Sequence, residues 1–169
     1  MSAADYHFVT HWKVKGPICL VYDILKDGEH YDRWWKPAYV KTDVVGTRKV
    51  RALVRAKLPY TLDFTTELVR EDPPREIEIR ATGELAGRGL WKLEENSGDV
   101  AVTFYWDVRA EKPWVRFLSP VLKPLFRWNH DWVMRTGEEE LQREIQRRVG
   151  AGDPAPTSAI TRNIQSRGE

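Results

Sequence analysis

The sequence predicts a single α+β domain in which one antiparallel sheet curves around a long C-terminal helix. Seven segments alternate apolar and polar residues with the period of two that is typical of a half-buried strand. Short links rich in turn residues join the last six segments, and such links favour antiparallel hairpins because a parallel crossover needs about a dozen residues or more. A helical period follows near the C-terminus. The length of 169 residues fits one hydrophobic core.

The first strand is expected over residues 6–14, and a short helix should follow it. Gly16 and Pro17 interrupt the alternation, and apolar residues then recur at helical spacing over residues 18–25. Cys19, the only cysteine, lies among apolar residues at the start of this helix. Because it has no partner for an internal disulfide, it is expected to be a small buried side chain.

A second short helix is expected within residues 30–37. The segment has room for one or two helical turns before Pro37, which discourages continuation of a helix. Trp34 and Trp35 are neighbours here, and adjacent side chains on a helix point in different directions. At most one of the two is therefore expected to be fully buried.

Six further strands are expected between the second helix and the C-terminal helix. Sorting each strand by alternation gives one apolar face and one face rich in charged residues, as in an antiparallel sheet with one side in water. Another element of the chain must therefore cover the apolar face. The six strands are expected at residues 40–45, 49–57, 61–70, 75–82, 84–94 and 99–109.

The cover is expected to be the long helix near the C-terminus. Ser119 and Pro120 are typical of a helix start, Pro124 favours a kink or a second start, and the helix should run to about Val149. Its apolar stripe should face the sheet. Gly137 lies within this stretch and should allow a neighbouring element to approach the helix backbone closely.

The folded domain is expected to comprise residues 1–149. Residues 150–169 are rich in Gly, Pro, Ser and Thr, which predicts a flexible C-terminal tail. The N-terminal residues lack a basic region followed by an apolar run, and no stretch of about 18 apolar residues occurs in the chain. These features favour a cytoplasmic protein without stable membrane insertion, present as a monomer or a weak homodimer.

The charge pattern and the missing motifs argue against several classes of function. The net charge is +2, and the 27 basic and 25 acidic residues are spread along the chain, so nucleic acid is not an expected partner. The glycine-rich motifs of nucleotide sites are absent, so no cofactor is expected. His7 and His11 lie on one face of a strand, too far apart for chelation and without an evident third ligand, so no metal is expected.

Four short motifs accompany this order of elements. They read VYDIL, YDRWW, GRGLW and NHDW at residues 21–25, 31–35, 87–91 and 129–132. In element order and in these motifs, about residues 5–149 resemble the polyketide cyclase/dehydrase and lipid-transport branch of the START/Bet v 1-like (SRPBCC) superfamily. The resemblance implies a helix-grip fold with an elongated apolar cavity between the sheet and the long helix. It says less about activity, because the superfamily hosts lipid carriers, cyclases and hormone receptors.

The candidate ligand-binding residues lie on the apolar face of the sheet, on the second short helix and on the inner stripe of the long helix. Their large aromatic side chains are suited to flat cavity walls or, alternatively, to filling the core. Both interpretations are open for Trp91, because the inward Gly87 and Gly89 leave a gap that a neighbouring Trp fills or a ligand occupies. The candidates are Trp35, Phe64, Thr66, Trp91, Phe104, Trp106, Phe126, Asn129, His130 and Val133.

His130 is the candidate catalytic residue. Phe126 precedes it by four residues and Val133 follows it by three, so the inner stripe of the helix should include it. Two interpretations remain open: a proton shuttle or hydrogen-bond anchor for a ligand carbonyl, or a structural histidine bonded to a backbone carbonyl or strand hydroxyl. The inner strand positions offer hydroxyl groups but no carboxylate to orient a general base, which favours the structural role.

The first functional hypothesis is binding or transport of an apolar small molecule, such as a lipid, an acyl chain or an aromatic polyketide-like compound. The alternative is a polyketide cyclase or dehydratase-like enzyme in which His130 works with Asn129, Thr66 or Tyr60. A third hypothesis is an interaction domain whose cavity is filled by its own tryptophans, of which the chain has eight. That hypothesis predicts an interior with no continuous void.

Overall fold

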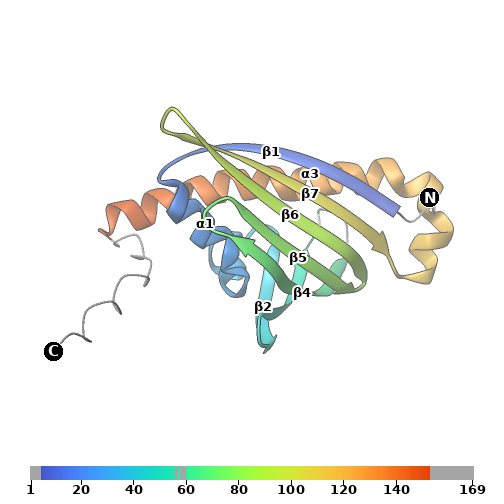
Figure 1. Cartoon of the computed structure of the whole chain (residues 1–169). Coiled ribbons are helices and arrows are strands. Elements are labelled where there is room, and N and C mark those ends of the chain that lie inside the picture. The colour runs from blue at the N-terminus through green and yellow to red at the C-terminus, as the bar shows by residue number, and fades with distance from the viewer. Residues whose placement is uncertain (1–4, 56, 58–59, 153–169) are drawn as a thin grey trace.

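Seven strands, three α-helices and one 3-10 turn make up the described part of the chain. The computed structural model describes residues 5–55, 57 and 60–152, apart from the side chains of residues 114–120. Figure 1 shows the curved sheet with the long helix beside it. In chain order the elements are β1 (Asp5–Lys15), α1 (Ile18–Lys26), η1 (Gly28–His30), α2 (Tyr31–Trp34), β2 (Tyr39–Gly46), β3 (Lys49–Arg55), β4 (Thr61–Asp72), β5 (Glu76–Gly83), β6 (Leu85–Asn96), β7 (Asp99–Ala110) and α3 (Pro113–Gly150).

The strands form one antiparallel sheet in the order β1-β7-β6-β5-β4-β3-β2. Strands β2 to β7 follow one another as a meander. β1 pairs along its whole length with β7, from Asp5 opposite Arg109 to Lys15 opposite Asp99. This pairing brings the first strand next to the last. The predicted α+β helix-grip architecture, with two short helices after the first strand, is confirmed.

One face of the sheet is buried, as the alternation predicts. Along β7 every second side chain is buried, and the residues between them are exposed or half-buried. Because successive side chains of a strand point to opposite faces, this pattern places the buried set on one side. The buried set of β7 comprises Val100, Val102, Phe104, Trp106, Val108 and Ala110.

Side chains of α3 are hydrogen-bonded to the backbone of β1. Glu138 Oε1 accepts a hydrogen bond from the N–H of Lys13 (2.9 Å), and Gln142 Oε1 accepts one from the N–H of Lys15 (2.8 Å). Gln142 Nε2 in turn donates to the carbonyl oxygen of Lys15 (3.0 Å). Figure 1 shows α3 running beside β1 along the sheet, and these bonds fix that position for the second half of the helix.

The helix start predicted at Ser119 and Pro120 is wrong, because α3 begins at Pro113. Pro113 follows an extended Lys112 and occupies the first turn, where its fixed φ and missing N–H cost nothing. Figure 1 shows the first turns of α3 at an angle to the rest, as expected for a helix that contains Pro120 and Pro124. In the described part of the chain, no helix has both the length and the apolar character needed to cross a membrane.

Trp34 and Trp35 are both buried, which corrects the expectation that at most one would be. Their side chains are 4% and 2% exposed. The two indoles stack with ring centroids 5.3 Å apart and an angle of 23° between their planes. Because α2 ends at Trp34, Trp35 leaves helical geometry and its ring turns to the same core.

Cys19 is exposed, so the prediction of a buried thiol is wrong. It lies in the first turn of α1, just before the residues through which this helix contacts the core. A sequence surrounded by apolar residues does not distinguish the outer side of the first turn from the inner side. The buried residues of α1 are Leu20, Val21, Tyr22, Ile24 and Leu25.

Gly137 lies where α3 packs against Trp35 and Trp12, so the predicted close approach to its backbone is confirmed. A Cβ atom at Gly137 would lie 2.3 Å from Trp35 Cζ2 and 2.9 Å from Trp12 Cη2. Trp35 also donates a hydrogen bond from Nε1 to the carbonyl oxygen of Val133, one turn earlier in α3 (3.2 Å). The absence of a side chain at Gly137 therefore sets how closely α3 packs.

Replacing Gly137 by alanine should destabilise the protein. The added methyl group overlaps two buried indoles, and such overpacking costs about 1–3 kcal/mol, which exceeds the roughly 1 kcal/mol that alanine gains by helix propensity. Urea unfolding measures the difference. Gly150→Ala is the matched control, because no atom lies within 4 Å of the place its methyl group would take, and it should be at least as stable as the wild type. Equal stability of Gly137→Ala and wild type would contradict the packing argument.

Candidate functional site

A cavity of about 570 Å³ lies between the buried face of the sheet and the helices. Residues from all seven strands and from α1, α2 and α3 line it, and most of these residues are aliphatic or aromatic. The volume falls within the range of roughly 300–1,000 Å³ that is usual for small-molecule sites. A void of this size is inconsistent with an interior filled by tryptophan side chains.

The structure brings all the residues predicted for the site to the wall of this one cavity. β4 contributes Phe64 and Thr66, β6 and β7 contribute three aromatic residues, and α3 contributes four residues from successive turns. Trp35 follows α2 and closes one part of the wall. The complete set is Trp35, Phe64, Thr66, Trp91, Phe104, Trp106, Phe126, Asn129, His130 and Val133.

The floor of the cavity is an aromatic series on β6 and β7. Trp91 stacks on Phe104 with centroids 3.9 Å apart and planes 19° from parallel, and Phe104 stacks on Trp106 at 5.4 Å. The gap expected at Gly89 is filled, because a Cβ there would lie 2.9 Å from the ring of Trp106. At Gly87 it would lie 2.0 Å from the carbonyl oxygen of Asp107. The two glycines therefore let β7 and its indole pack against β6.

His130 faces the cavity from α3 with both ring nitrogens unpaired. Its ring stacks on Phe8 of β1, with centroids 3.8 Å apart and planes 9° from parallel. Nδ1 and Nε2 are buried and have no hydrogen-bond partner among the described residues. The nearest carboxylate oxygen, on Asp131, lies 3.5 Å from Nδ1, too far for a good hydrogen bond. The carbonyl or hydroxyl partner expected for a structural histidine is therefore not found among the described residues.

Burial keeps the imidazole of His130 neutral. The side chain is only 13% exposed, and desolvation lowers its pKa to about 4, although the nearby Asp131 carboxylate acts in the opposite direction. At neutral pH the ring thus offers one N–H donor and one nitrogen acceptor to the cavity. A buried donor or acceptor without a partner costs about 1–3 kcal/mol.

Asn129 and Thr66 already have partners. The amide oxygen of Asn129, which is 6% exposed, accepts a hydrogen bond from the backbone N–H of Lys57 (2.9 Å). This bond holds the link between β3 and β4 against α3. The hydroxyl of Thr66 donates to the carbonyl oxygen of Val50 at a long distance of 3.4 Å. Neither side chain is oriented toward His130 by these bonds.

Polar and charged groups gather at the end of the cavity near the start of α3. The ring of Phe126 meets Tyr6 and Tyr60 edge-on, with centroids 5.8 Å and 6.2 Å apart. Burial, with Tyr6 nearby, raises the pKa of Tyr60 to about 12, so its phenol is protonated at neutral pH. An ion pair between Lys112 and Glu84 (2.8 Å) also borders the cavity here.

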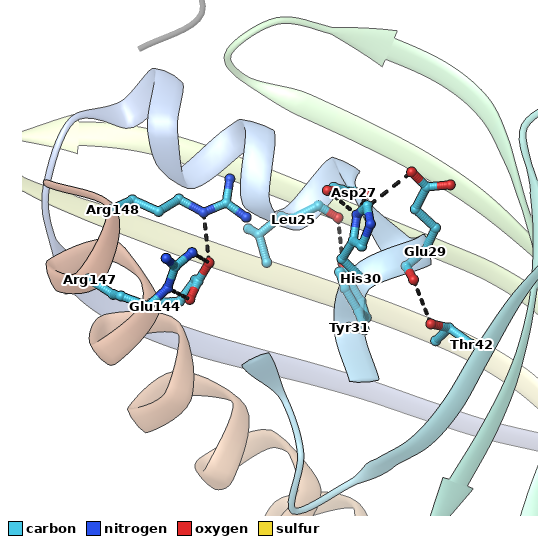
Figure 2. A network of polar contacts seen from close by, with 9 residues as sticks. All are labelled: Leu25, Asp27, Glu29, His30, Tyr31, Thr42, Glu144, Arg147 and Arg148. Carbon is cyan, nitrogen blue, oxygen red and sulfur yellow. Dashed lines mark hydrogen bonds and ion pairs between the residues drawn. The ribbon is translucent and has the colours of Figure 1, made fainter. Parts of the chain in front are cut away.

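The opposite end of the cavity is bordered by the segment from α1 to η1. His30 Nδ1 lies 2.8 Å and 2.7 Å from the two carboxylate oxygens of Asp27, and Thr42 Oγ1 donates to the carbonyl oxygen of Glu29 (2.6 Å). Figure 2 shows His30 between the two carboxylates with Thr42 of β2 alongside. Among the described residues, Asp27, Glu29 and His30 have ligand atoms close enough to hold a metal ion, within 4.8 Å. The hydrogen bond between His30 and Asp27 accounts for this geometry within the turn, and the bond from Thr42 attaches η1 to β2.

Sequence reasoning missed several residues of the cavity wall. Phe8 lies on the same face of β1 as Tyr6, so the alternation of that strand was a sufficient signal for it. Gly28 and Glu29 were not predicted, since the η1 turn has no periodic pattern that indicates a face. Leu25 belongs to the helical pattern of residues 18–25, but that pattern does not indicate that α1 reaches the cavity. The wall is therefore wider than the predicted set.

Solved structures share this fold. A conserved protein from Geobacillus kaustophilus has a TM-score of 0.69 at 13% identity, covering 85% of this chain and 97% of its own. The Zhui aromatase/cyclase from a Streptomyces species has a TM-score of 0.68 at 18% identity, with 88% and 98% covered. A START superfamily protein from Mycobacterium smegmatis has a TM-score of 0.67 at 12% identity, with 83% and 97% covered. At these identities the likeness shows the fold alone.

Sequence comparison identifies the family. No curated protein sequence matches the chain. The family model described as polyketide cyclase / dehydrase and lipid transport matches residues 7–146, which include most of β1, all the other strands and most of α3. The matched region thus carries nearly all of the cavity wall, and the resemblance inferred from the motifs is confirmed. The chain belongs to the polyketide cyclase / dehydrase and lipid transport family, with the helix-grip fold of START-like proteins.

Proposed function

We propose that this protein binds and carries an elongated, largely apolar small molecule in the cavity between the sheet and α3. The observation that carries the proposal is a cavity of about 570 Å³ with mostly apolar walls, into which His130 presents a neutral imidazole that has no hydrogen-bond partner among the described residues. A fatty-acyl chain, another lipid or an aromatic polyketide-like compound has the required character. The family description, which includes lipid transport, supports this class of ligand.

The proposed ligand carries a hydrogen-bonding group at one end. His130 lines the cavity, and its two nitrogens lack partners among the described residues, so a ligand carbonyl or hydroxyl that reaches them removes an energetic penalty. The flat stack of Trp91, Phe104 and Trp106 favours contact with rings or extended chains along the rest of the ligand. The ten residues of the predicted site form the proposed binding surface.

A cyclase or dehydratase is the second candidate, favoured by the imidazole of His130 at the cavity wall and by the family description. General base catalysis is most efficient when the pKa lies near the working pH, whereas burial lowers the pKa of His130 to about 4. The oxygen of Asp131 at 3.5 Å does not orient the ring, and Asn129 is bonded to Lys57. Binding is therefore the function that the geometry supports best.

A direct test separates the two candidates. Native mass spectrometry of the protein purified from cells should detect a copurifying apolar compound. For the enzyme, the purified protein is incubated with a linear poly-β-ketone and the appearance of an aromatic product is followed. Turnover that disappears in His130→Phe would establish the enzyme and displace the carrier proposal.

Filling the cavity should abolish binding of an apolar probe. Thr66→Phe adds a phenyl ring at the cavity wall and should weaken the affinity for the dye Nile red about tenfold or more, because the ring occupies space that the dye needs. Fluorescence titration measures the affinity. Thr65→Phe is the matched control, since this neighbouring half-buried residue of β4 is not part of the cavity wall, and it should bind the dye normally. Equal loss in both variants would contradict the assignment of the cavity.

The neutral state of His130 predicts a specific pH dependence of stability. The folded pKa of about 4 lies below the ordinary value of 6.5, so the unfolded state binds the extra proton first as the pH falls. The free energy of unfolding should therefore decrease by up to roughly 1.4 kcal/mol per pH unit between these two values. His130→Phe, which keeps the stack on Phe8, should lack this loss when urea unfolding is repeated across the range. Parallel curves for the two proteins would show that His130 is not buried in the neutral form.

A further inference from the structure

The outer side of the first half of α3 carries an exposed apolar stripe, formed by Val121, Leu125 and Trp128. These side chains are 79%, 39% and 49% exposed. Spacings of four and three residues place them on one side of a helix. Exposed apolar residues that gather on one face mark a surface for another protein or for a membrane. In the second half of α3, Val149 is the large apolar residue with comparable exposure, at 56%.

The charge around the stripe is mainly positive, although Asp131, three residues after Trp128, is an exposed carboxylate. Residues 112–130 contain the basic residues Lys112, Arg116, Lys123 and Arg127 and no acidic residue. Residues 131–149, in contrast, contain five acidic and four basic residues, several of which form ion pairs within the helix. The first half of α3 therefore combines apolar and cationic character, whereas the second half is charge-balanced.

Lys57 adds a further positive charge beside the stripe. This exposed residue lies in the link between β3 and β4, and its Nζ stands 5.4 Å from the centroid of the Trp128 ring. The backbone N–H of the same residue is bonded to Asn129, so the lysine is held next to α3. A half-exposed tryptophan among basic side chains is typical of helices that lie at the boundary between lipid headgroups and acyl chains.

We propose that this stripe docks on the surface of a membrane that contains anionic lipids. Val121, Leu125 and Trp128 enter the interfacial region, while Lys57 and Arg127 contact the negatively charged headgroups. The helix lies on the membrane and does not cross it. The excess of positive charge favours a membrane over a second copy of the chain, because a symmetric dimer through the stripe would bring two sets of Lys57 and Arg127 together, with Asp131 as one carboxylate per copy against them.

The same turns of α3 carry the cavity wall on their other side. Phe126 and His130 line the cavity at the end bordered by Tyr60 and Lys112, whereas the residues of the stripe are exposed. A membrane bound to the stripe therefore lies next to this end of the cavity. The docking surface itself does not depend on what the cavity holds, so it is tested without a ligand.

Vesicle flotation tests the proposal with the full-length protein. The wild type should float with vesicles of phosphatidylcholine and phosphatidylglycerol, and it should float much less with phosphatidylcholine alone or at high salt, where the charges are screened. Val121→Ser/Leu125→Ser/Trp128→Ser should reduce flotation to the level seen with phosphatidylcholine. Lys57→Gln/Arg127→Gln should weaken binding about five-fold for each basic residue removed.

Matched controls lie on the second half of the same helix. Val149→Ser and Arg143→Gln change an exposed valine and an exposed arginine four or more turns beyond Trp128, and both should float like the wild type. The charge variant keeps the test valid if the triple variant fails to fold, since it leaves the apolar residues in place. Failure of the wild type to bind anionic vesicles would overturn the proposal. So would binding that neither variant reduces, or a wild-type dimer in solution that the triple variant converts to a monomer.

Discussion

The contact between Gly137 and the indole of Trp35 fixes the distance between α3 and the rest of the domain. A tryptophan held there by stacking on Trp34 and by a hydrogen bond to Val133 determines how far the helix lies from the sheet. Trp35 and Val133 also line the cavity, so the same contact limits its width at this point. The fold and the binding surface therefore depend on one close approach between a glycine and an aromatic ring. A looser contact would change both stability and the shape of the cavity.

Most of the fold could be predicted from the sequence, because a strand with one solvent-exposed face has polar and apolar residues in alternation, and this alternation shows which side faces the core. The long strands β4, β6 and β7 carry this signal clearly. The signal is weaker where elements are short: α2 is a single turn, so its sequence did not indicate that Trp34 and Trp35 turn to the same side. The start of α3 was missed for another reason. Pro113 and Pro120 both suit a first turn, and the choice between them depends on where β7 ends.

The wall of the candidate site was predictable to the extent that it consists of strand and helix faces. The hydrogen bonds that the side chains of this wall make could not be predicted. The sequence placed His130 on the inner stripe, but whether its nitrogens find partners depends on which residue of β1 lies opposite, and that residue is Phe8. Likewise, Gly87 and Gly89 indicated that space is left on β6, while the groups that take it, the backbone of Asp107 and the ring of Trp106, come from the neighbouring strand. Such pairings are set by the register of the sheet and cannot be read from one segment.

An open sheet presents unpaired backbone groups at its two edges, and these can recruit strands from other molecules and start aggregation. The edge formed by β2 is interrupted by two register shifts, which make it a poor template for further pairing. The edge formed by β1 has no such irregularity, and there Glu138 and Gln142 take up the N–H groups of Lys13 and Lys15. The helix that covers the cavity thus also blocks backbone hydrogen bonding by another molecule at this end of β1. The two roles belong to different residues of one helix, since Glu138 and Gln142 bond the edge of the sheet and residues 126–134 contribute the cavity wall.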